Sequence, residues 1–505
     1  MSTGDSISDS PEPQQRAAKP RQPDIARDTS FFIGADAMAT LFGLVSTLIL
    51  TRMFVEHDYG MWVLILAFFQ TWFMFVDMGI PTVMVRDIPR GRSQAKGLLH
   101  IAIRIQLLVC CVLFPLGTAL ALKLWGDDGE WSRAFILLAI AGALPALSEA
   151  HRVTLRALGE ARREAFSRML DRFIVSAGMI IAWSAGLNSV LPYAIAATAG
   201  PIAALIYAWW IGGKIAERAS REGTEGEDDI LYSNKALMLL ALPYMFTLGM
   251  TPLISHLDKF LLKWYLDYEA VALFDVAWKV YAAGLTVATA LRKSLLPVYG
   301  GLTDKPEQLG KSISAALALA RWLIPPGVLF GGAIGIIFIP ILFTTRYTNS
   351  VSLFLILLGA WSMWALAAPF QVAVQTRISG WNYAGMMGLV VLVDLIAGVI
   401  LIPKFGVVGA AFSTVIAQIA MLCLAILFSR HIPGVLAMLP SILALASAAL
   451  IVALCLQQVV IGQLDVVWAI VAFAALFTIS WITGWRPKPP FEEMLKLTNI
   501  EAEES

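Results

Sequence analysis

The feature that most constrains this chain is a succession of apolar blocks, each about twenty residues or longer, that recurs along nearly its whole length. A helix of about 20 apolar residues crosses a hydrocarbon core about 30 Å thick. Inside a bilayer the backbone groups must find partners within the segment, so such blocks fold as helices. Of the 505 residues 58% are hydrophobic and 14% charged, whereas about 25% are charged in soluble proteins. The sequence therefore predicts an all-α polytopic membrane protein.

Fourteen transmembrane helices are predicted. Their approximate ranges are 31–54, 60–85, 98–122, 134–155, 170–187, 190–213, 236–264, 270–296, 312–345, 350–376, 382–402, 407–429, 434–457 and 466–484. The first block follows several basic residues, as a signal peptide would. It is about twice as long as the apolar part of a signal peptide and carries Asp36, so we interpret it as a retained helix.

The distribution of basic residues predicts the orientation of these helices. With the N-terminus inside, 27 of the 37 Lys and Arg residues fall on the cytoplasmic side. Cytoplasmic loops of membrane proteins carry such an excess of Lys and Arg. We therefore predict a multi-pass protein of the plasma (inner) membrane with both termini in the cytoplasm.

The chain is predicted to contain two six-helix lobes in a pseudo-two-fold arrangement. Arg156-Ala-Leu-Gly159 follows the fourth helix and Arg377-Ile-Ser-Gly380 follows the tenth, which indicates an internal repeat of the kind common in transporters. The predicted parts are a disordered cytoplasmic tail (1–28), an N-lobe of six helices (29–213), a cytoplasmic linker (214–234), a C-lobe of six helices (235–431), two extra C-terminal helices (432–485) and a cytoplasmic tail (486–505).

Several classes of function are disfavoured by composition and motifs. The four cysteines lie inside apolar blocks, which does not suit a disulfide framework or a zinc site. The sequence shows no nucleotide-binding or hydrolase motif, so no cofactor and no enzymatic activity are predicted. The net charge of +1 gives no reason to expect a nucleic acid partner. The predicted external loops are short, which argues against a membrane glycosyltransferase.

A set of motifs, in order along the chain, resembles a known family. Thr51-Arg-Met-Phe-Val-Glu-His-Asp-Tyr-Gly60 resembles the signature of the polysaccharide-transport proteins, the O-antigen flippase branch of the multidrug/oligosaccharidyl-lipid/polysaccharide (MOP) exporter superfamily. Four further segments are also similar to that family: Asp77-Met-Gly-Ile-Pro-Thr-Val-Met-Val-Arg86, Leu257-Asp-Lys-Phe-Leu261, Leu296-Pro-Val298 and Ile402-Pro-Lys-Phe-Gly-Val-Val-Gly-Ala410. Leu273-Phe-Asp-Val276 departs from the Gly-x-Tyr usual at that point.

The resemblance implies a flippase. It implies two lobes around a central cavity that opens alternately to either side, and a saccharide on a polyprenyl diphosphate or dolichyl phosphate carrier moved from the cytoplasmic to the outer leaflet. The two extra helices would then flank the lipid tail, and membrane lipid and polysaccharide biosynthesis proteins are the expected partners. Two alternatives stay open: a multidrug or organic-cation exporter of the same superfamily, and a non-transporting membrane subunit of a polysaccharide synthase.

Basic side chains within the predicted helices are the candidates for binding the carrier phosphate: Arg104, His256, Lys259, Lys279 and Arg321. A charge at the bilayer centre costs about 2.5–3.5 kcal/mol on insertion scales, so such residues face a wet cavity or an opposite charge. His256 and Lys259 share a face of the seventh helix. Asp275 and Lys279 are four residues apart, so mutual neutralisation is the alternative interpretation.

Acidic residues within the predicted helices are the candidates for coupling transport to H⁺ or Na⁺. We select Asp36, Asp77 and Asp258 for this role, and Glu149 and Asp394 are further acids of the same kind. Each of them is equally explained as the counter-ion of a buried Arg or Lys. Coupling is also dispensable in principle, because moving one negative charge outward gains about 2.3 kcal/mol per 100 mV of inside-negative potential.

Overall fold

The structure is a computed structural model that describes residues 25–126, 129–222, 234–377 and 380–484. Within these ranges every regular element is a helix. The long helices are α1 (Ile25–Met53), α2 (Glu56–Phe73), α4 (Ala95–Trp125), α5 (Glu130–Ala157), α6 (Ala161–Ser184), α7 (Val190–Glu222), α8 (Asn234–Tyr265), α9 (Tyr268–Gly301), α10 (Pro306–Phe343), α11 (Asn349–Arg377), α12 (Gly380–Phe405), α13 (Val407–Ser429), α14 (Val435–Val460) and α15 (Val466–Gly484). The short ones are α3 (Ile80–Asp87), η1 (Met74–Asp77), η2 (Arg92–Gln94) and η3 (Thr345–Tyr347).

The all-helical membrane fold predicted from the sequence is confirmed. Ten stretches of the described residues are long and apolar enough to cross a membrane. Helices α1, α6, α9 and α15 are not among the ten, so fourteen crossings stay a prediction. Several predicted boundaries differ: α1 begins at Ile25 inside the predicted tail, α6 begins at Ala161 instead of about residue 170, and α7 continues to Glu222 inside the predicted linker. The remainder of the predicted tails, and residues 223–233 of the predicted linker, lie outside the described residues.

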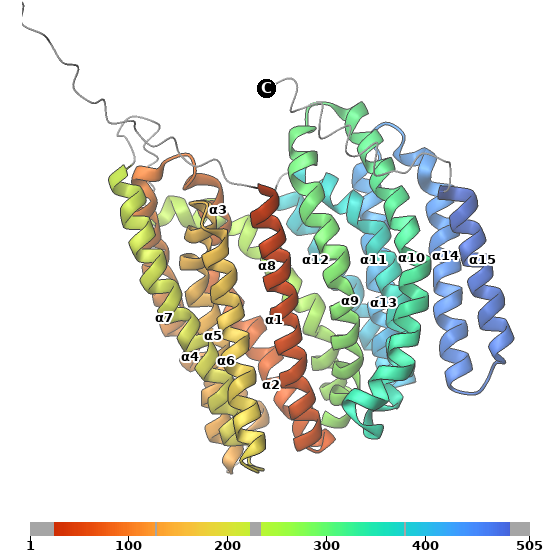
Figure 1. Cartoon of the computed structure of the whole chain (residues 1–505), viewed down its shortest axis with the longest axis horizontal. Helices are drawn as coiled ribbons and strands as arrows, with labels where there is room; N and C mark the ends of the chain where they lie inside the picture. Colours follow the sequence, from red (N-terminus) through yellow and green to blue (C-terminus); the bar gives the residue numbers. More distant parts are fainter. Residues whose placement is uncertain (1–24, 127–128, 223–233, 378–379, 485–505) are drawn as a thin grey trace, which may run out of the picture.

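The helices form two bundles that lie side by side (Figure 1). We call α1–α7 the N-bundle and α8–α13 the C-bundle, and α14 and α15 pack on the outer side of the latter. The same neighbours recur in each: α1 packs on α6 as α8 packs on α12, and α5 packs on α7 as α11 packs on α13. We call the end where α1 begins the near end, which the sequence predicts to be cytoplasmic, and the end where α1 finishes the far end.

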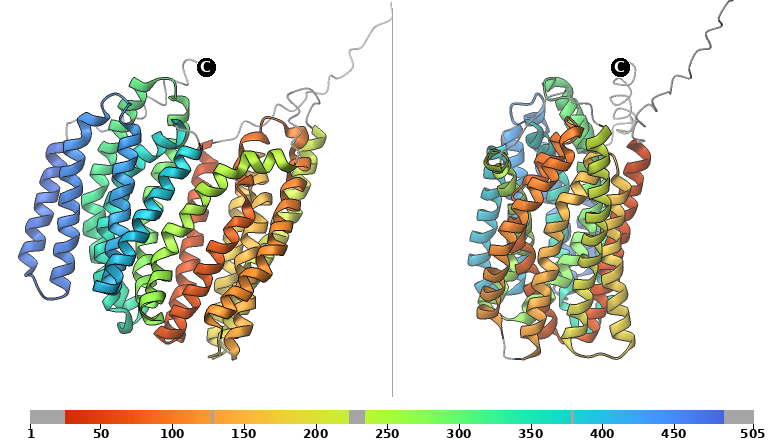
Figure 2. Two further views of the ribbon diagram at one scale, coloured as in Figure 1. Left: turned by 180° about the vertical axis from the view of Figure 1, so that it is seen from behind. Right: turned by 90° about the vertical axis from the view of Figure 1, so that its left-hand side faces the viewer.

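Helix α8 belongs to both bundles. Figure 2 shows it starting among the N-bundle helices and finishing among those of the C-bundle. Its early residues Leu237 and Ala241 lie in one buried apolar cluster with Met84 of α3, and its later part packs on α9, α12 and α13. Pro243 and Pro252 lie between these two parts. Each proline removes a helical hydrogen bond and permits a bend, which suits a helix that passes from one bundle to the other.

The block predicted as one helix over 60–85 is interrupted in the structure. Helix α2 passes into the short 3-10 helix η1, and then Met78 (φ 50°) and Gly79 (φ 70°) turn the chain before α3 begins. A Cβ on Gly79 would overlap the backbone of α8 at Ala241 and Met245. Gly79 therefore serves both the left-handed backbone and the close approach of the two bundles. This contact lies toward the near end.

At the far end the bundles meet through the start of α2. A Cβ on Gly60 would overlap the carbonyl oxygen of Tyr268 at the start of α9, so Gly60 permits a close backbone approach. His57 packs edge-on against the Tyr268 ring at 4.8 Å between centroids. Arg52 Nη2 donates to the carbonyl oxygen of Leu342 in α10 at 3.4 Å. The segment of the sequence with the family-like signature thus forms the far-end contact between the bundles.

Candidate functional site

A buried polar cluster joins the two bundles near the far end. Lys259 Nζ of α8 lies 2.8 Å from Asp275 Oδ1 of α9, and Lys279 Nζ lies 2.9 Å from Asp275 Oδ2. The Tyr59 hydroxyl of α2 donates to Asp275 Oδ2 at 2.6 Å and accepts from Lys279 Nζ at 2.9 Å. Tyr59 is the contribution of the N-bundle, while the other three side chains come from the C-bundle. We call these four residues the lysine cluster.

The local sequence explains why these groups meet. Helix α8 ends at Tyr265 and α9 starts at Tyr268, so the two helices are antiparallel neighbours joined by a short turn. The Asp267 side chain caps α9 by accepting from the amide of Ala270 at 2.7 Å. Residues at similar distances before and after this turn therefore face each other, as Lys259 and Asp275 do. The predicted neutralisation of Lys279 by Asp275 is present as the i,i+4 ion pair.

The lysine cluster carries more positive than negative charge. Two ammonium groups share one carboxylate, and Arg172 of α6 lies close enough to repel Lys279. The Lys259 and Asp275 side chains are 4% and 1% exposed, whereas that of Lys279 is 34% exposed. Lys279 is therefore the member able to reach an anion without leaving its counter-ion. The arrangement suits a phosphate better than it suits an organic cation.

The structure brings together only part of the predicted basic set. His256 lies one turn before Lys259 in α8 and within electrostatic range of it, and its Nδ1 is buried without a hydrogen-bond partner among the described residues. Arg104 is exposed on α4. Arg321 donates to Ser441 Oγ at 2.6 Å, and its carbonyl accepts from Ser480 Oγ at 2.7 Å. These contacts place Arg321 against α14 and α15 rather than in the lysine cluster.

A second buried polar group lies inside the C-bundle. Asp258 of α8, 1% exposed, accepts from Ser413 Oγ at 2.7 Å and from Thr414 Oγ1 at 2.8 Å, both in α13. Asp394 of α12, also 1% exposed, lies within electrostatic range of Asp258, and its Oδ1 has no hydrogen-bond partner among the described residues. The Tyr281 hydroxyl is likewise buried and unpartnered there. Two buried carboxylates and hydroxyl oxygens provide ligands for a proton or a hard cation.

The acid predicted in the second span lies at the interruption of α2. Asp77 is the last residue of η1, and its Oδ1 accepts from Gln106 Nε2 of α4 at 3.2 Å. Glu149 and Arg152 of α5 act on it electrostatically. The side chain of Asp36 lies outside the described part of the structure.

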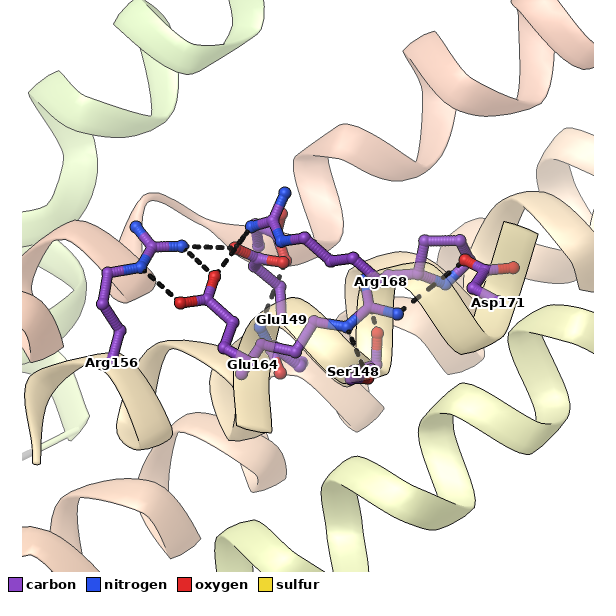
Figure 3. A network of polar contacts seen from close by, with 11 residues as sticks. Ser148, Glu149, Arg156, Glu164, Arg168 and Asp171 are labelled. Carbon is purple, nitrogen blue, oxygen red and sulfur yellow. Dashed lines mark hydrogen bonds and ion pairs between the residues drawn. The ribbon is translucent and has the colours of Figure 1, made fainter. Parts of the chain in front are cut away.

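Figure 3 shows a charge network between α5 and α6, and Glu149 and Arg152 of this network act electrostatically on Asp77. Glu164, which is fully buried, is bound by Arg156 and by Arg168, whose Nη2 lies 3.0 Å from Glu164 Oε1. Glu149 Oε1 lies 3.3 Å from Arg168 Nη2, and Arg152 Nη2 lies 3.8 Å from Asp171 Oδ2. Three arginines balance three carboxylates, so this network fixes the two helices and leaves no excess charge for a ligand. Glu149 is therefore the counter-ion of Arg168, which agrees with the counter-ion interpretation given above and not with a role in ion coupling.

Sequence reasoning missed three residues that shape these sites. Tyr59 stands next to Gly60 in the signature but was not given a chemical role. Arg172 lies in α6, within the helix predicted over 170–187, but is not among the predicted site residues. Gln106 is an uncharged polar residue in the long apolar block predicted over 98–122. A polar side chain in such a block indicates a polar contact with another helix, and this pattern points to Gln106.

The sequence and the fold are both similar to those of known proteins. A family described as polysaccharide biosynthesis protein matches residues 25–301. A probable flippase of Haloferax volcanii, AglR, is 28% identical over 203 residues, which span 38% of this chain and 41% of that protein. The fold is similar to the lipid II flippase MurJ in an inward closed conformation, with a TM-score of 0.65, 14% identity, and coverage of 90% of this chain and 97% of that one.

A second structural likeness is to an outward-facing multidrug resistance transporter of the MATE family in the MOP superfamily. Its TM-score is 0.60 at 15% identity, with coverage of 82% of this chain and 96% of the other. Both likenesses concern the fold.

Proposed function

Since the chain belongs to the polysaccharide biosynthesis protein family, we propose that it is a flippase of the MOP superfamily for a lipid-linked saccharide. It would carry a glycan on a polyprenyl diphosphate or dolichyl phosphate from the cytoplasmic to the outer leaflet of the plasma (inner) membrane, with both termini in the cytoplasm. The two bundles would be the lobes that open alternately. The likeness to proteins described as flippases supports the proposal that this chain is a flippase.

The observation that carries the proposal is the lysine cluster. It is buried at the boundary of the two bundles, its net charge is positive, and the exposed member is Lys279. A carrier lipid presents one or two phosphates between its glycan and its tail, and a phosphate that reaches Lys279 would balance the excess charge. An organic cation would add to that excess, which disfavours a multidrug exporter.

The coupling cation, in this proposal, binds in the C-bundle. Asp258 and Asp394 are both buried and mutually repelling, which a proton or Na⁺ would relieve. Both sites use α8, which supplies Lys259 to one and Asp258 to the other. Binding at the lysine cluster would therefore affect binding at Asp258, and the reverse, because α8 contributes to both sites.

Purified protein in liposomes provides the test. We expect it to move a fluorescent short-chain glycolipid on a polyprenyl diphosphate or dolichyl phosphate between leaflets. Lys279→Gln should reduce the rate at least tenfold while the amount of folded protein stays near normal, because Lys279 is the partly exposed member. The matched control is Lys263→Gln, whose ammonium lies 3.8 Å from the Tyr268 ring centroid outside the cluster.

Equal flipping by Lys279→Gln and by the unaltered protein would exclude the lysine cluster as the phosphate site. Transport of ethidium-like cations, without movement of the glycolipid, would favour the exporter. Absence of both, with a polysaccharide synthase co-purifying, would favour a non-transporting subunit.

A further inference from the structure

The amide of Gln106 has an acceptor that the folded chain does not satisfy. Gln106 is 1% exposed in the middle of α4, and its Nε2 donates to Asp77 Oδ1 at 3.2 Å. Its Oε1 is buried and has no hydrogen-bond partner among the described residues. A buried polar atom of this kind costs about 1–3 kcal/mol unless something donates to it. Because the same amide group contacts Asp77, the unsatisfied oxygen belongs to the surroundings of that carboxyl group.

Among the described residues, the charged groups around Asp77 do not include a cation that is paired with it. In the described part of the chain no Lys, Arg or His forms an ion pair with Asp77. The charged groups that act on it are Glu149 and Arg152, both in α5. Glu149 has Arg168 as its own ion-pair partner at 3.3 Å. Arg152 is turned to Ser167 at 3.2 Å and to Asp171 at 3.8 Å. Asp77 is thus the acid of this region without a cation of its own.

We infer that Asp77 is a proton-binding site of the N-bundle and that its protonated carboxyl group pairs with the amide of Gln106. In such a pair the amide N–H donates to the carbonyl oxygen of the acid, and the acid O–H donates to the amide oxygen. The proton supplies the donor that Oε1 lacks and removes the repulsion from Glu149. This site is separate from the acids of the C-bundle and does not depend on the identity of the transported lipid.

The position of Asp77 gives its proton a mechanical consequence. Asp77 directly precedes Met78 and Gly79, the two residues with positive φ that interrupt the second span. Gly79 in turn lies against the α8 backbone at Ala241 and Met245. A change of charge on Asp77 therefore acts at the contact between the N-bundle and α8, toward the near end. Interrupted helices with buried ionisable groups are common coupling elements in transporters.

Infrared titration of the full-length protein in phosphatidylcholine nanodiscs tests the inference. The carbonyl stretch of protonated carboxyl groups is recorded between pH 4 and pH 9 in difference mode. We expect the contribution of one carboxyl group to this band to be absent in Asp77→Asn. This variant should fold, because the asparagine amide can donate to Gln106 Oε1 as the protonated acid does. Glu149→Gln should move the midpoint of that group to lower pH, because a like charge is removed.

Two further variants make the result specific. In Gln106→Leu the band should move to higher wavenumber, because the carbonyl oxygen of protonated Asp77 loses the hydrogen bond from the Gln106 amide N–H. Asp465→Asn, at an exposed turn between α14 and α15, is the matched control and should leave the group unchanged. A band that Asp77→Asn does not alter would overturn the inference. A band that is lost in Asp77→Asn but unaffected by Gln106→Leu would overturn the pairing. Neither result bears on flipping, which the liposome assay measures separately.

Discussion

A single carboxylate, that of Asp275, holds two lysines and a tyrosine hydroxyl in one buried cluster. Removing one partner of a buried ion pair costs about 3–5 kcal/mol, because the remaining charge has no compensation. Here the loss would leave two cations facing each other. At the scale of residues, Asp275 is therefore a structural requirement, whereas Lys279, the partly exposed member, is the proposed phosphate ligand.

Substitution of Asp275 should show this difference. Asp275→Asn should lower the yield of folded protein and the melting temperature strongly, as judged by fluorescence-detected size exclusion during heating. The double variant Asp275→Asn with Lys259→Met should recover part of the loss, because it removes the more deeply buried uncompensated cation. No recovery in the double variant would mean that Asp275 stabilises the fold by something other than charge.

Tyr59 gives a prediction on closure of the far end. Its hydroxyl is the polar link from the N-bundle to Asp275 and Lys279. Tyr59→Phe removes that link but keeps the ring that packs on Tyr347 at 6.0 Å between centroids. The loss of a hydrogen bond to a charged group, about 1.5–3 kcal/mol, should favour separation of the bundles there. A spin-label pair on α2 and α9 at the far end should show longer distances in Tyr59→Phe, and unchanged distances would argue against a link.

At the scale of elements, two glycines allow the bundles to touch at both ends. Gly60 and Gly79 each approach a backbone segment that a Cβ would overlap, and Gly79 also has a positive φ. Gly60→Ala and Gly79→Ala should each reduce folded protein, measured as the monodisperse fraction after detergent extraction. Gly97→Ala in α4, where nothing lies within 4 Å of the added Cβ, is the matched control and should have no such effect. Normal yields for all three would contradict the close approach.

The sequence predicted the helices well and their interruption poorly. Apolar length identifies a span without reference to its neighbours, so a helix lies in each predicted range, although the range 60–85 holds three helices instead of one. The turn at Met78 and Gly79 is different, because it exists to bring the chain against α8, far away in the sequence. The same limit applies to Arg321. A lone arginine among apolar residues indicates a need for polar neighbours, but Ser441 and Ser480 are more than a hundred residues away.

At the scale of the whole molecule, orientation is the prediction that matters most for transport. In a cysteine-free background, single cysteines at Asn188 or Asp465 should react with an impermeant thiol reagent added to intact cells. Cysteines at Ser93 or Asp304 should react only after the membrane is permeabilised. The physical reason is the excess of Lys and Arg on the near-end loops. Reaction of Ser93→Cys in intact cells would invert the proposed direction of flipping.

The passage of α8 from one bundle to the other also bears on how the protein is made. Domains generally fold as units during synthesis, the N-terminal one first. Here the near-end apolar cluster of the N-bundle includes Leu237 and Ala241, which lie in α8. When the ribosome has translated α7, the helix that completes this cluster is therefore still missing. The apolar side chains of α3 gain their full set of packing partners only after α8 has been inserted. Two separately expressed halves would consequently assemble better when the break follows α8 than when it precedes it.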